Sequence, residues 1–183
     1  MSESSSRGDS VTELEEVNVW LGLGSNMEPE KHIPEAVRDL ATVFGELQVS
    51  PVYESEAIGF SGDNFLNLVV GIRTNCSPRE LVTQLRQVEE RHGRQRSDEK
   101  FLSRTLDIDL LTYGDQVVND GPIQLPRDEI LRFAFVLLPL SDVAGSEVHP
   151  TTGSTYNQLW AAFNKQDQPL WQVDGGLVSG VLA

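Results

Sequence analysis

Two carboxylates and several guanidinium groups lie close together in the stretch RSDEKFLSRTLDIDLL, residues 96–111. Asp107 and Asp109 alternate there with apolar residues, as expected for a strand with one buried face. Because side chains alternate across a strand, both carboxylates would emerge from the other face, about 7 Å apart. Like charges at that spacing favour a cation between them, and Mg²⁺ prefers oxygen ligands. The spacing therefore indicates a magnesium site on one face of a strand.

Basic residues gather on the N-terminal side of these two carboxylates. Guanidinium groups bind phosphate oxygens through paired hydrogen bonds and compensate the charge that develops during transfer. Strand aspartates beside a basic loop therefore match a layout for Mg²⁺-dependent phosphoryl transfer. Six of the fourteen Lys and Arg residues of the chain fall in this segment: Arg86, Arg91, Arg94, Arg96, Lys100 and Arg104.

A structural explanation of the same pattern stays open. Two aspartates on one strand often face solvent without binding a metal, and basic residues can form a solvated helix face held by ion pairs. The position of Arg104, three residues before Asp107, favours the functional interpretation. The acidic residues available for ion pairs in this segment are Glu89, Glu90, Asp98 and Glu99.

The sequence lacks the residue patterns of several other kinds of catalytic site. His32, His92 and His149 are far apart in the sequence and Cys76 is the single cysteine, which argues against a Cys/His zinc site. Neither a Walker A motif nor a G-x-S-x-G motif occurs.

The composition narrows the class of protein. A chain of 183 residues is long enough for one domain with a substantial core. Its net charge of −14 argues against general binding to nucleic acid or to anionic membranes, and no stretch of eighteen apolar residues could span a bilayer. A single cysteine excludes an internal disulfide, and the N-terminus lacks the apolar segment of a secretory signal. We expect a cytoplasmic protein, with a monomer favoured.

Apolar alternation predicts the strands that would carry these residues. Pro51 marks the second strand as an edge strand, because proline cannot donate a ladder hydrogen bond. Gly24, Ser25 and Asn26 form a turn after the first strand, and residues 57–64 form a glycine-containing loop. The predicted strands cover residues 17–23, 46–55, 65–74 and 105–114, with a hairpin strand over 116–119 that pairs back on the last of these.

Helical periodicity predicts the remaining elements. Pro34 would lie in the first turn of a helix that begins near residue 32. Ser77 and Glu80 form a capping-box pattern, and Gly93 ends that helix. The third predicted helix is expected to stop near Pro139. The predicted helices cover residues 30–44, 77–93, 127–140 and 154–163.

The order of these elements predicts the fold. It reads strand, helix, strand, strand, helix, strand, then helices, which indicates an α+β protein with a ferredoxin-like βαββαβ core and extra C-terminal helices. We expect a disordered acidic tail over residues 1–16, one domain over residues 17–165 and a C-terminal tail over residues 166–183.

Beyond these patterns, three motifs resemble one enzyme family. RTLDIDLLTYG at residues 104–114, preceded by EERHGRQR at 89–96 and LGLGSN at 21–26, is similar to 6-hydroxymethyl-7,8-dihydropterin pyrophosphokinases of folate biosynthesis. The likeness extends from Val17 to Leu140. It implies a ferredoxin-like αβα sandwich that transfers pyrophosphate from ATP to the hydroxymethyl group of a reduced pterin and releases AMP.

The resemblance also implies roles for individual residues. Asp107 and Asp109 match the residues that hold two Mg²⁺ ions with ATP, and Arg94 and Arg104 match arginines that contact phosphates and assist catalysis. Further nucleotide positions fall on Glu89, Arg96, Phe101, Leu110 and Arg127. The pterin positions fall on Ser55, Ile58, Phe65, Asn67 and Phe135, where the two phenylalanines suit stacking on a flat ring and the asparagine can pair with an amide edge.

The chain departs from the family pattern mainly on the nucleotide side. Leu102 and Ser103 stand where a glycine-containing pair usually precedes the arginine, and Arg127 and Asp128 stand where His-Tyr is usual. Phe133 replaces an arginine. Further replaced positions are Arg86, Pro122 and Gln124.

Three interpretations fit these departures. The first is a working pyrophosphokinase with altered nucleotide contacts, in which Arg127 serves a phosphate. The second is a divergent paralogue that binds a pterin but has lost or changed the transfer, and the third is another transferase with a different acceptor. The joint presence of Asp107, Asp109, Arg94 and Arg104 favours the enzyme, since unused charges are costly in a partly buried site.

Overall fold

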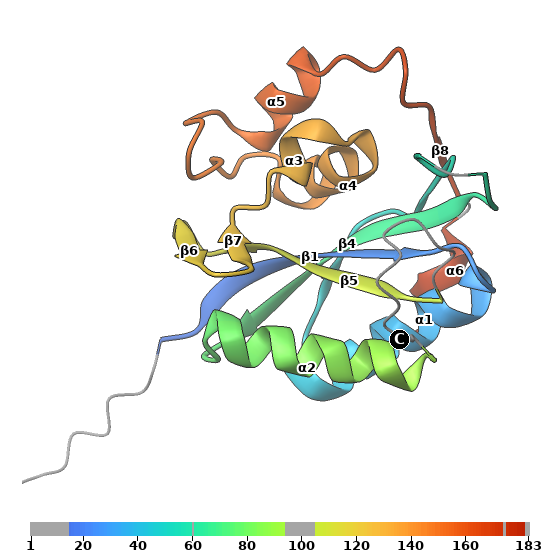
Figure 1. Ribbon diagram of the computed structural model, residues 1–183, viewed down its shortest axis with the longest axis horizontal. Coiled ribbons are helices and arrows are strands. Elements are labelled where there is room, and N and C mark those ends of the chain that lie inside the picture. Colours follow the sequence, from blue (N-terminus) through green and yellow to red (C-terminus); the bar gives the residue numbers. More distant parts are fainter. Residues whose placement is uncertain (1–14, 60, 94–104, 174, 182–183) are drawn as a thin grey trace, which may run out of the picture.

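The computed structural model describes residues 15–59, 61–93, 105–173 and 175–181. A six-stranded antiparallel sheet forms the middle of three layers (Figure 1). Its strand order is β5-β1-β4-β3-β8, with β2 paired to β4. The strands are β1 (Val17–Ser25), β2 (Gln48–Val49), β3 (Tyr53–Ser55), β4 (Phe65–Thr74), β5 (Asp107–Tyr113) and β8 (Leu170–Gln172).

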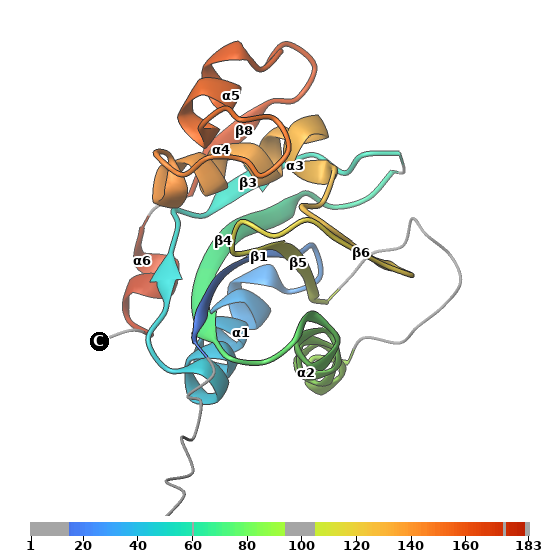
Figure 2. The same ribbon diagram turned by 90° about the vertical axis from the view of Figure 1, so that its left-hand side faces the viewer.

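Helices cover both faces of this sheet (Figure 2). α1 (Pro29–Phe44) and α2 (Pro78–Arg91) lie on one face, with α6 (Gly176–Ser179) beside α1. The opposite face is covered by the helices α3 (Glu129–Arg132), α4 (Ala134–Ala144) and α5 (Tyr156–Ala162). A separate two-stranded sheet consists of β6 (Val118–Asp120) and β7 (Ile123–Leu125). Within the described ranges, no helix is both long and apolar enough to cross a bilayer.

The predicted α+β class and ferredoxin-like core are confirmed. β1, α1, β3, β4, α2 and β5 follow one another in the chain, and the antiparallel order β5-β1-β4-β3 is the split βαβ arrangement. Alternation along the strands builds two cores. Leu21, Leu68 and Ile108 pack against α1 and α2, whereas Trp20 and Val69 face α4.

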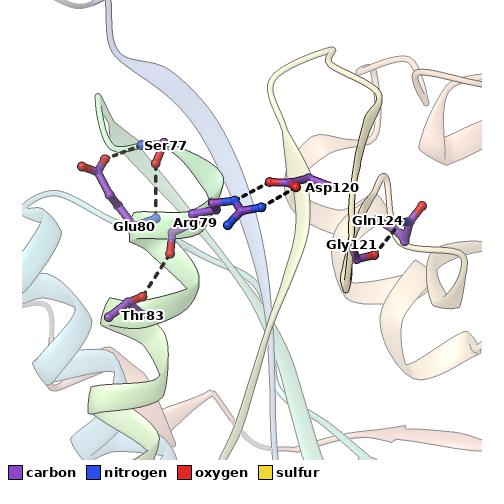
Figure 3. A network of polar contacts seen from close by, with 7 residues as sticks. All are labelled: Ser77, Arg79, Glu80, Thr83, Asp120, Gly121 and Gln124. Atoms are coloured by element: carbon purple, nitrogen blue, oxygen red, sulfur yellow. Dashed lines mark hydrogen bonds and ion pairs between the residues drawn. The ribbon is translucent and has the colours of Figure 1, made fainter.

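The N-terminus of α2 is held as the sequence predicts (Figure 3). The Ser77 side chain accepts a hydrogen bond from the Glu80 N–H, and the Glu80 carboxylate accepts one from the Ser77 N–H. Next to this cap, Arg79 donates two hydrogen bonds of 2.6 Å to Asp120 at the end of β6. Both partners are exposed, so the pair positions the β6–β7 hairpin against α2 more than it stabilises the fold.

Several predicted boundaries are wrong in the first half of the chain. α1 begins at Pro29, so Pro34 lies inside the helix and not in its first turn. The strand predicted over residues 46–55 is interrupted, because the Ser50 hydroxyl accepts the Val69 N–H that a continuous strand would bond. β8 covers the outer side of β3, so β3 is not an edge strand.

The second half differs from the prediction for local reasons. The predicted hairpin strand at residues 116–119 pairs with β7 and not with β5. The helix predicted over residues 127–140 breaks at Phe133, whose φ of −120° and ψ of 124° are extended. It then resumes as α4 and continues through Pro139 to Ala144. The segment expected as a C-terminal tail contains β8 and α6.

Close packing at the centre of the sheet gives a testable requirement for glycine. A Cβ atom at Gly71 would lie 2.4 Å from Cζ3 of Trp20, and the indole N–H is fixed by a 2.7 Å hydrogen bond to Glu147. We expect Gly71→Ala to lower the free energy of unfolding by about 1–3 kcal/mol, measured by urea denaturation. Gly180→Ala is the control, because a Cβ atom added there would have no non-neighbouring atom within 4 Å. Equal stability of the two variants would contradict this packing constraint.

Candidate active site

A cavity of about 850 Å³ opens on the sheet face that α3 and α4 cover. Its walls come from β1, β3, β4, β5 and the segment over residues 127–136. Eight residues that the sequence predicts for the site line this one space, although they come from four separate parts of the chain. They are Ser55, Ile58, Phe65, Asn67, Asp107, Asp109, Arg127 and Phe135.

Two glycines of β1 form the floor of this cavity. Gly22 lies opposite Asp109, and Gly24 lies opposite both Asp107 and Asn67. A Cβ atom at Gly24 would stand 3.4 Å from the Asn67 Oδ1. Because these positions carry no side chain, the carboxylates of β5 and the amide of β4 share one uninterrupted surface.

The acidic end of the cavity contains Asp107 and Asp109 on the same face of β5. Burial, with the neighbouring charge of Asp107, raises the pKa of Asp109 to about 7, although the positive charge of Arg127 acts in the opposite direction. The carboxylate therefore resists ionisation unless a further positive charge comes close. A pair of carboxylates with this electrostatic need fits a divalent cation such as Mg²⁺, which takes carboxylate and phosphate oxygens together.

Arg127 is the described cation nearest to this acidic pair. β5 has a bulge at Leu111, and the Leu111 carbonyl accepts a 2.9 Å hydrogen bond from the Arg127 N–H. The guanidinium donates to both carboxylate oxygens of Glu129, at 2.8 and 3.2 Å, and its Nη1 lies 3.7 Å from Oδ1 of Asp109. Burial raises the pKa of Glu129, but the hydrogen bond and positive charge of Arg127, together with hydrogen bonds to backbone and to Asp128, lower the pKa to about 2. Arg127 is therefore held in place by Glu129 with one edge turned to Asp109.

An aromatic wall forms the other end of the cavity. Phe133 and Phe135 stack with ring centroids 5.1 Å apart and 15° between the ring planes. The guanidinium of Arg132 lies over the Phe133 ring at 5.1 Å. The Gln168 side chain bridges the extended backbone at Phe133. It accepts a hydrogen bond from the Ala134 N–H and donates one to the Arg132 carbonyl. A side chain from beyond α5 thus stabilises the helix break that presents both rings.

Polar groups of β3 and β4 lie between the two ends. The Asn67 amide nitrogen donates to the Ser55 hydroxyl at 2.8 Å and to the Tyr53 carbonyl at 3.3 Å. These bonds direct Oδ1 of Asn67 towards Gly24 and the cavity floor. Ser55 and Asn67 are each 5% exposed, whereas Ile58 is 47% exposed at the cavity mouth. A flat ligand with a hydrogen-bonding edge would meet a fixed polar pattern here.

Two predicted site residues that the structure describes do not line this cavity, and four others lie outside the described ranges. The Leu110 side chain points into the core on the opposite face of the sheet and is 5% exposed, so only its backbone could contact a nucleotide. Glu89 of α2 accepts the Ile108 N–H at 2.8 Å and supports β5 from that side. The predicted residues outside the described ranges are Arg94, Arg96, Phe101 and Arg104.

The cavity also contains residues that the sequence did not reveal. Glu129 and Arg132 line it, as does Phe133, which stands out in the sequence only as a departure from a family pattern. The alternating glycines at positions 22 and 24 were a usable signal, because glycine repeated on one face of a strand marks a surface that must stay bare. Nothing in the sequence indicated that Gln168 would reach the break between α3 and α4.

Comparison with protein families gives one match over most of the described domain. The family described as 7,8-dihydro-6-hydroxymethylpterin-pyrophosphokinase (HPPK) matches residues 20–145. A 2-amino-4-hydroxy-6-hydroxymethyldihydropteridine pyrophosphokinase of Synechocystis is 37% identical over 142 residues, which cover 76% of this chain and 72% of the relative. The enzyme of the same name from Aquifex aeolicus is 34% identical over 134 residues, covering 72% and 83%.

Solved structures support the same fold at low sequence identity. The wild-type HPPK-DHPS protein of Plasmodium falciparum superposes with a TM-score of 0.63 and 13% identity over 80% of this chain. An HPPK-DHPS chain in complex with substrates gives a TM-score of 0.64 and 12% identity. The present chain spans less than half the length of these proteins, 44% and 43% respectively.

The raised pKa of Asp109 predicts how stability depends on pH. In the folded protein the Asp109 carboxyl group keeps its proton up to about pH 7, whereas its ordinary pKa is 3.8. The contribution of this proton to the free energy of unfolding is therefore full below pH 3.8 and is lost as the pH rises through 7. We expect Asp109→Asn to flatten the decline in the free energy of unfolding over this range, measured by urea denaturation in EDTA. Asp115→Asn, at an exposed turn, should keep the wild-type pH dependence. A wild-type slope in Asp109→Asn would refute the assignment.

Proposed function

Because the chain belongs to the 7,8-dihydro-6-hydroxymethylpterin-pyrophosphokinase family, we propose that it transfers pyrophosphate from ATP to the hydroxymethyl group of 6-hydroxymethyl-7,8-dihydropterin and releases AMP. The product serves folate biosynthesis. The observation that carries this proposal is the single cavity with a carboxylate pair at one end and an aromatic wall with a fixed amide at the other. Such a space suits a triphosphate and a flat heterocycle placed end to end.

The acidic end would bind the triphosphate. Asp107 and Asp109 would hold Mg²⁺, two ions bound together with ATP, which supply positive charge to the phosphate oxygens. The pterin hydroxyl oxygen forms a bond to the β-phosphorus, the bond from that phosphorus to the oxygen of AMP breaks, and the hydroxyl proton is released. Arg127 lies beside Asp109 and can donate to a phosphate oxygen while Glu129 fixes its orientation.

The aromatic end would bind the pterin. Phe135 is backed by Phe133, and this stack offers one face to a flat ring, while Phe65 lines the same cavity from β4. Asn67, oriented by Ser55, presents its carbonyl oxygen to the donor edge of the heterocycle. Ile58 closes the mouth with an apolar side chain.

The remaining predicted roles belong to the same proposal. Arg94 and Arg104 contact the phosphates and assist the transfer, and Arg96 and Phe101 complete the nucleotide site. Glu89 acts from beneath β5 by holding the Ile108 N–H, which fixes the strand that carries both aspartates. We expect the enzyme to work as a monomer in the cytoplasm, with the described residues that line its cavity all within residues 17–165.

A pterin-binding paralogue without transferase activity is the rival interpretation. It is less favoured, because the relatives are named pyrophosphokinases and both cavity carboxylates are present beside an ordered arginine. One assay separates the two: purified protein with ATP, Mg²⁺ and hydroxymethyldihydropterin should release AMP. Pterin binding without AMP release would support the paralogue instead.

The carboxylate pair can be tested by substitution. We expect Asp107→Ala or Asp109→Ala to lower the rate of AMP formation by at least about 10²-fold, since each removes a ligand of the Mg²⁺ ions whose positive charge would stabilise the phosphate oxygens in the transition state. Pterin binding, measured by calorimetry without nucleotide, should stay close to that of the wild type. Asp115→Ala, outside the cavity, is the control for loss of a carboxylate. Unchanged turnover in Asp109→Ala would exclude the proposed metal role.

The aromatic wall makes a separate prediction about affinity. Phe135→Ala should weaken pterin binding by about 0.5–1.5 kcal/mol, roughly 2- to 12-fold, because a stacking surface is removed. Binding of ATP with Mg²⁺ should not change. Phe163→Ala removes a ring that stacks on Trp160 instead and serves as the matched control. If both variants bind pterin equally well, the stacking role of Phe135 is wrong.

A further inference from the structure

Two buried histidines meet on the sheet face opposite to the cavity. His32 lies in α1 and His92 lies at the C-cap of α2, and they are 7% and 6% exposed. Their Nδ1 atoms are 2.9 Å apart, and the rings are nearly perpendicular, at 74°. Sequence separation argued against a histidine-based metal site, but the packing of α1 beside α2 brings these two imidazoles together.

The hydrogen bonds around the pair define which nitrogen atoms are available. Nε2 of His92 lies 3.0 Å from the Asp39 carboxylate, which can only accept, so this nitrogen carries the proton. When Nε2 carries the only ring proton, the lone pair on Nδ1 of His92 accepts the hydrogen bond from Nδ1 of His32, and a metal ion could take the place of that proton. The Glu35 carboxylate approaches the same point, with Oε2 3.9 Å from Nδ1 of His92. Two imidazole nitrogens and one carboxylate oxygen therefore converge.

We propose that His32, Glu35 and His92 form a binding site for a divalent transition metal of the zinc type. Their three ligand atoms lie within 4.8 Å of one another. In a tetrahedral zinc site with bonds of about 2.0–2.2 Å, neighbouring ligand atoms are about 3.3–3.5 Å apart. A slight separation of the two rings and a rotation of Glu35 would reach that geometry, and water would take the fourth position.

Asp39 completes the arrangement from outside the ligand set. A carboxylate that accepts the second N–H of a metal-bound imidazole fixes the orientation of the ring and raises the basicity of the other nitrogen. Asp39 already holds His92 in this way. Metal binding through Nδ1 of His32 requires that this ring carry its proton on Nε2 instead of Nδ1.

The ligand types distinguish this site from the magnesium site of the cavity. Imidazole nitrogens suit zinc, cobalt or nickel, whereas Mg²⁺ requires an octahedron of oxygen atoms. The two sites also lie on opposite faces of the sheet. A metal bound here would join α1 to the end of α2, the helix whose Glu89 holds β5. It would therefore stabilise the fold without entering the catalytic cavity.

Zinc titration of the full chain tests this proposal. We would remove any histidine tag and titrate metal-free protein with Zn²⁺ against a chelating indicator, in the presence of excess Mg²⁺. One Zn²⁺ per chain should bind, His32→Gln should weaken binding by at least about 100-fold, and Asp39→Asn should weaken it by about 10- to 100-fold. Co²⁺ in place of Zn²⁺ should give the strong visible absorption of a tetrahedral complex.

Matched variants separate the proposal from misfolding and from the proposed function. Glu35 is 44% exposed at its side chain, so Glu35→Gln should fold normally and still lose affinity, whereas Glu30→Gln on the same helix should not. The double variant Asp107→Ala, Asp109→Ala should bind Zn²⁺ as the wild type does, whether or not the chain proves to be a pyrophosphokinase. Absence of saturable binding, or wild-type binding in His32→Gln, would overturn the site.

Discussion

The register of β5 is the constraint on which the active site depends. A shift of one residue would turn Asp107 and Asp109 into the core and bring apolar side chains to the cavity. Two contacts oppose such a shift: antiparallel pairing with β1, and the Glu89 carboxylate that accepts the Ile108 N–H from the helix side. The apolar face of β5 thus determines the position of the aspartates on its other face.

Charge and aromatic surface are brought together by residues that have little chemistry of their own. The glycines of β1 keep the floor open between the aspartates and Asn67, and the extended backbone at Phe133 turns two rings to the same space. Arg127 is held by a bulge in β5 and by Glu129. The reacting groups therefore depend on backbone geometry at least as much as on their own side chains.

Sequence patterns predicted the parts of the fold that local rules determine. The α2 cap at Ser77, the strand that became β4 and the single-face placement of both aspartates follow from capping and alternation, which act over a few residues. The break at Phe133 escaped prediction, because Gln168, 35 residues later in the chain, stabilises it. The meeting of His32 and His92 escaped for the same reason, since helix packing and not sequence spacing creates it.

The pairing of β8 with β3 has a consequence for shortened forms of this protein. A chain that ended at residue 165 would retain every residue that lines the cavity, yet it would lose both the cover of β3 and the side chain that seals the junction of α3 and α4. Ser55 would then lie on an open strand edge, where another chain could pair. Removal of the residues after 165 would therefore promote aggregation and loosen the aromatic wall that is proposed to bind the heterocycle.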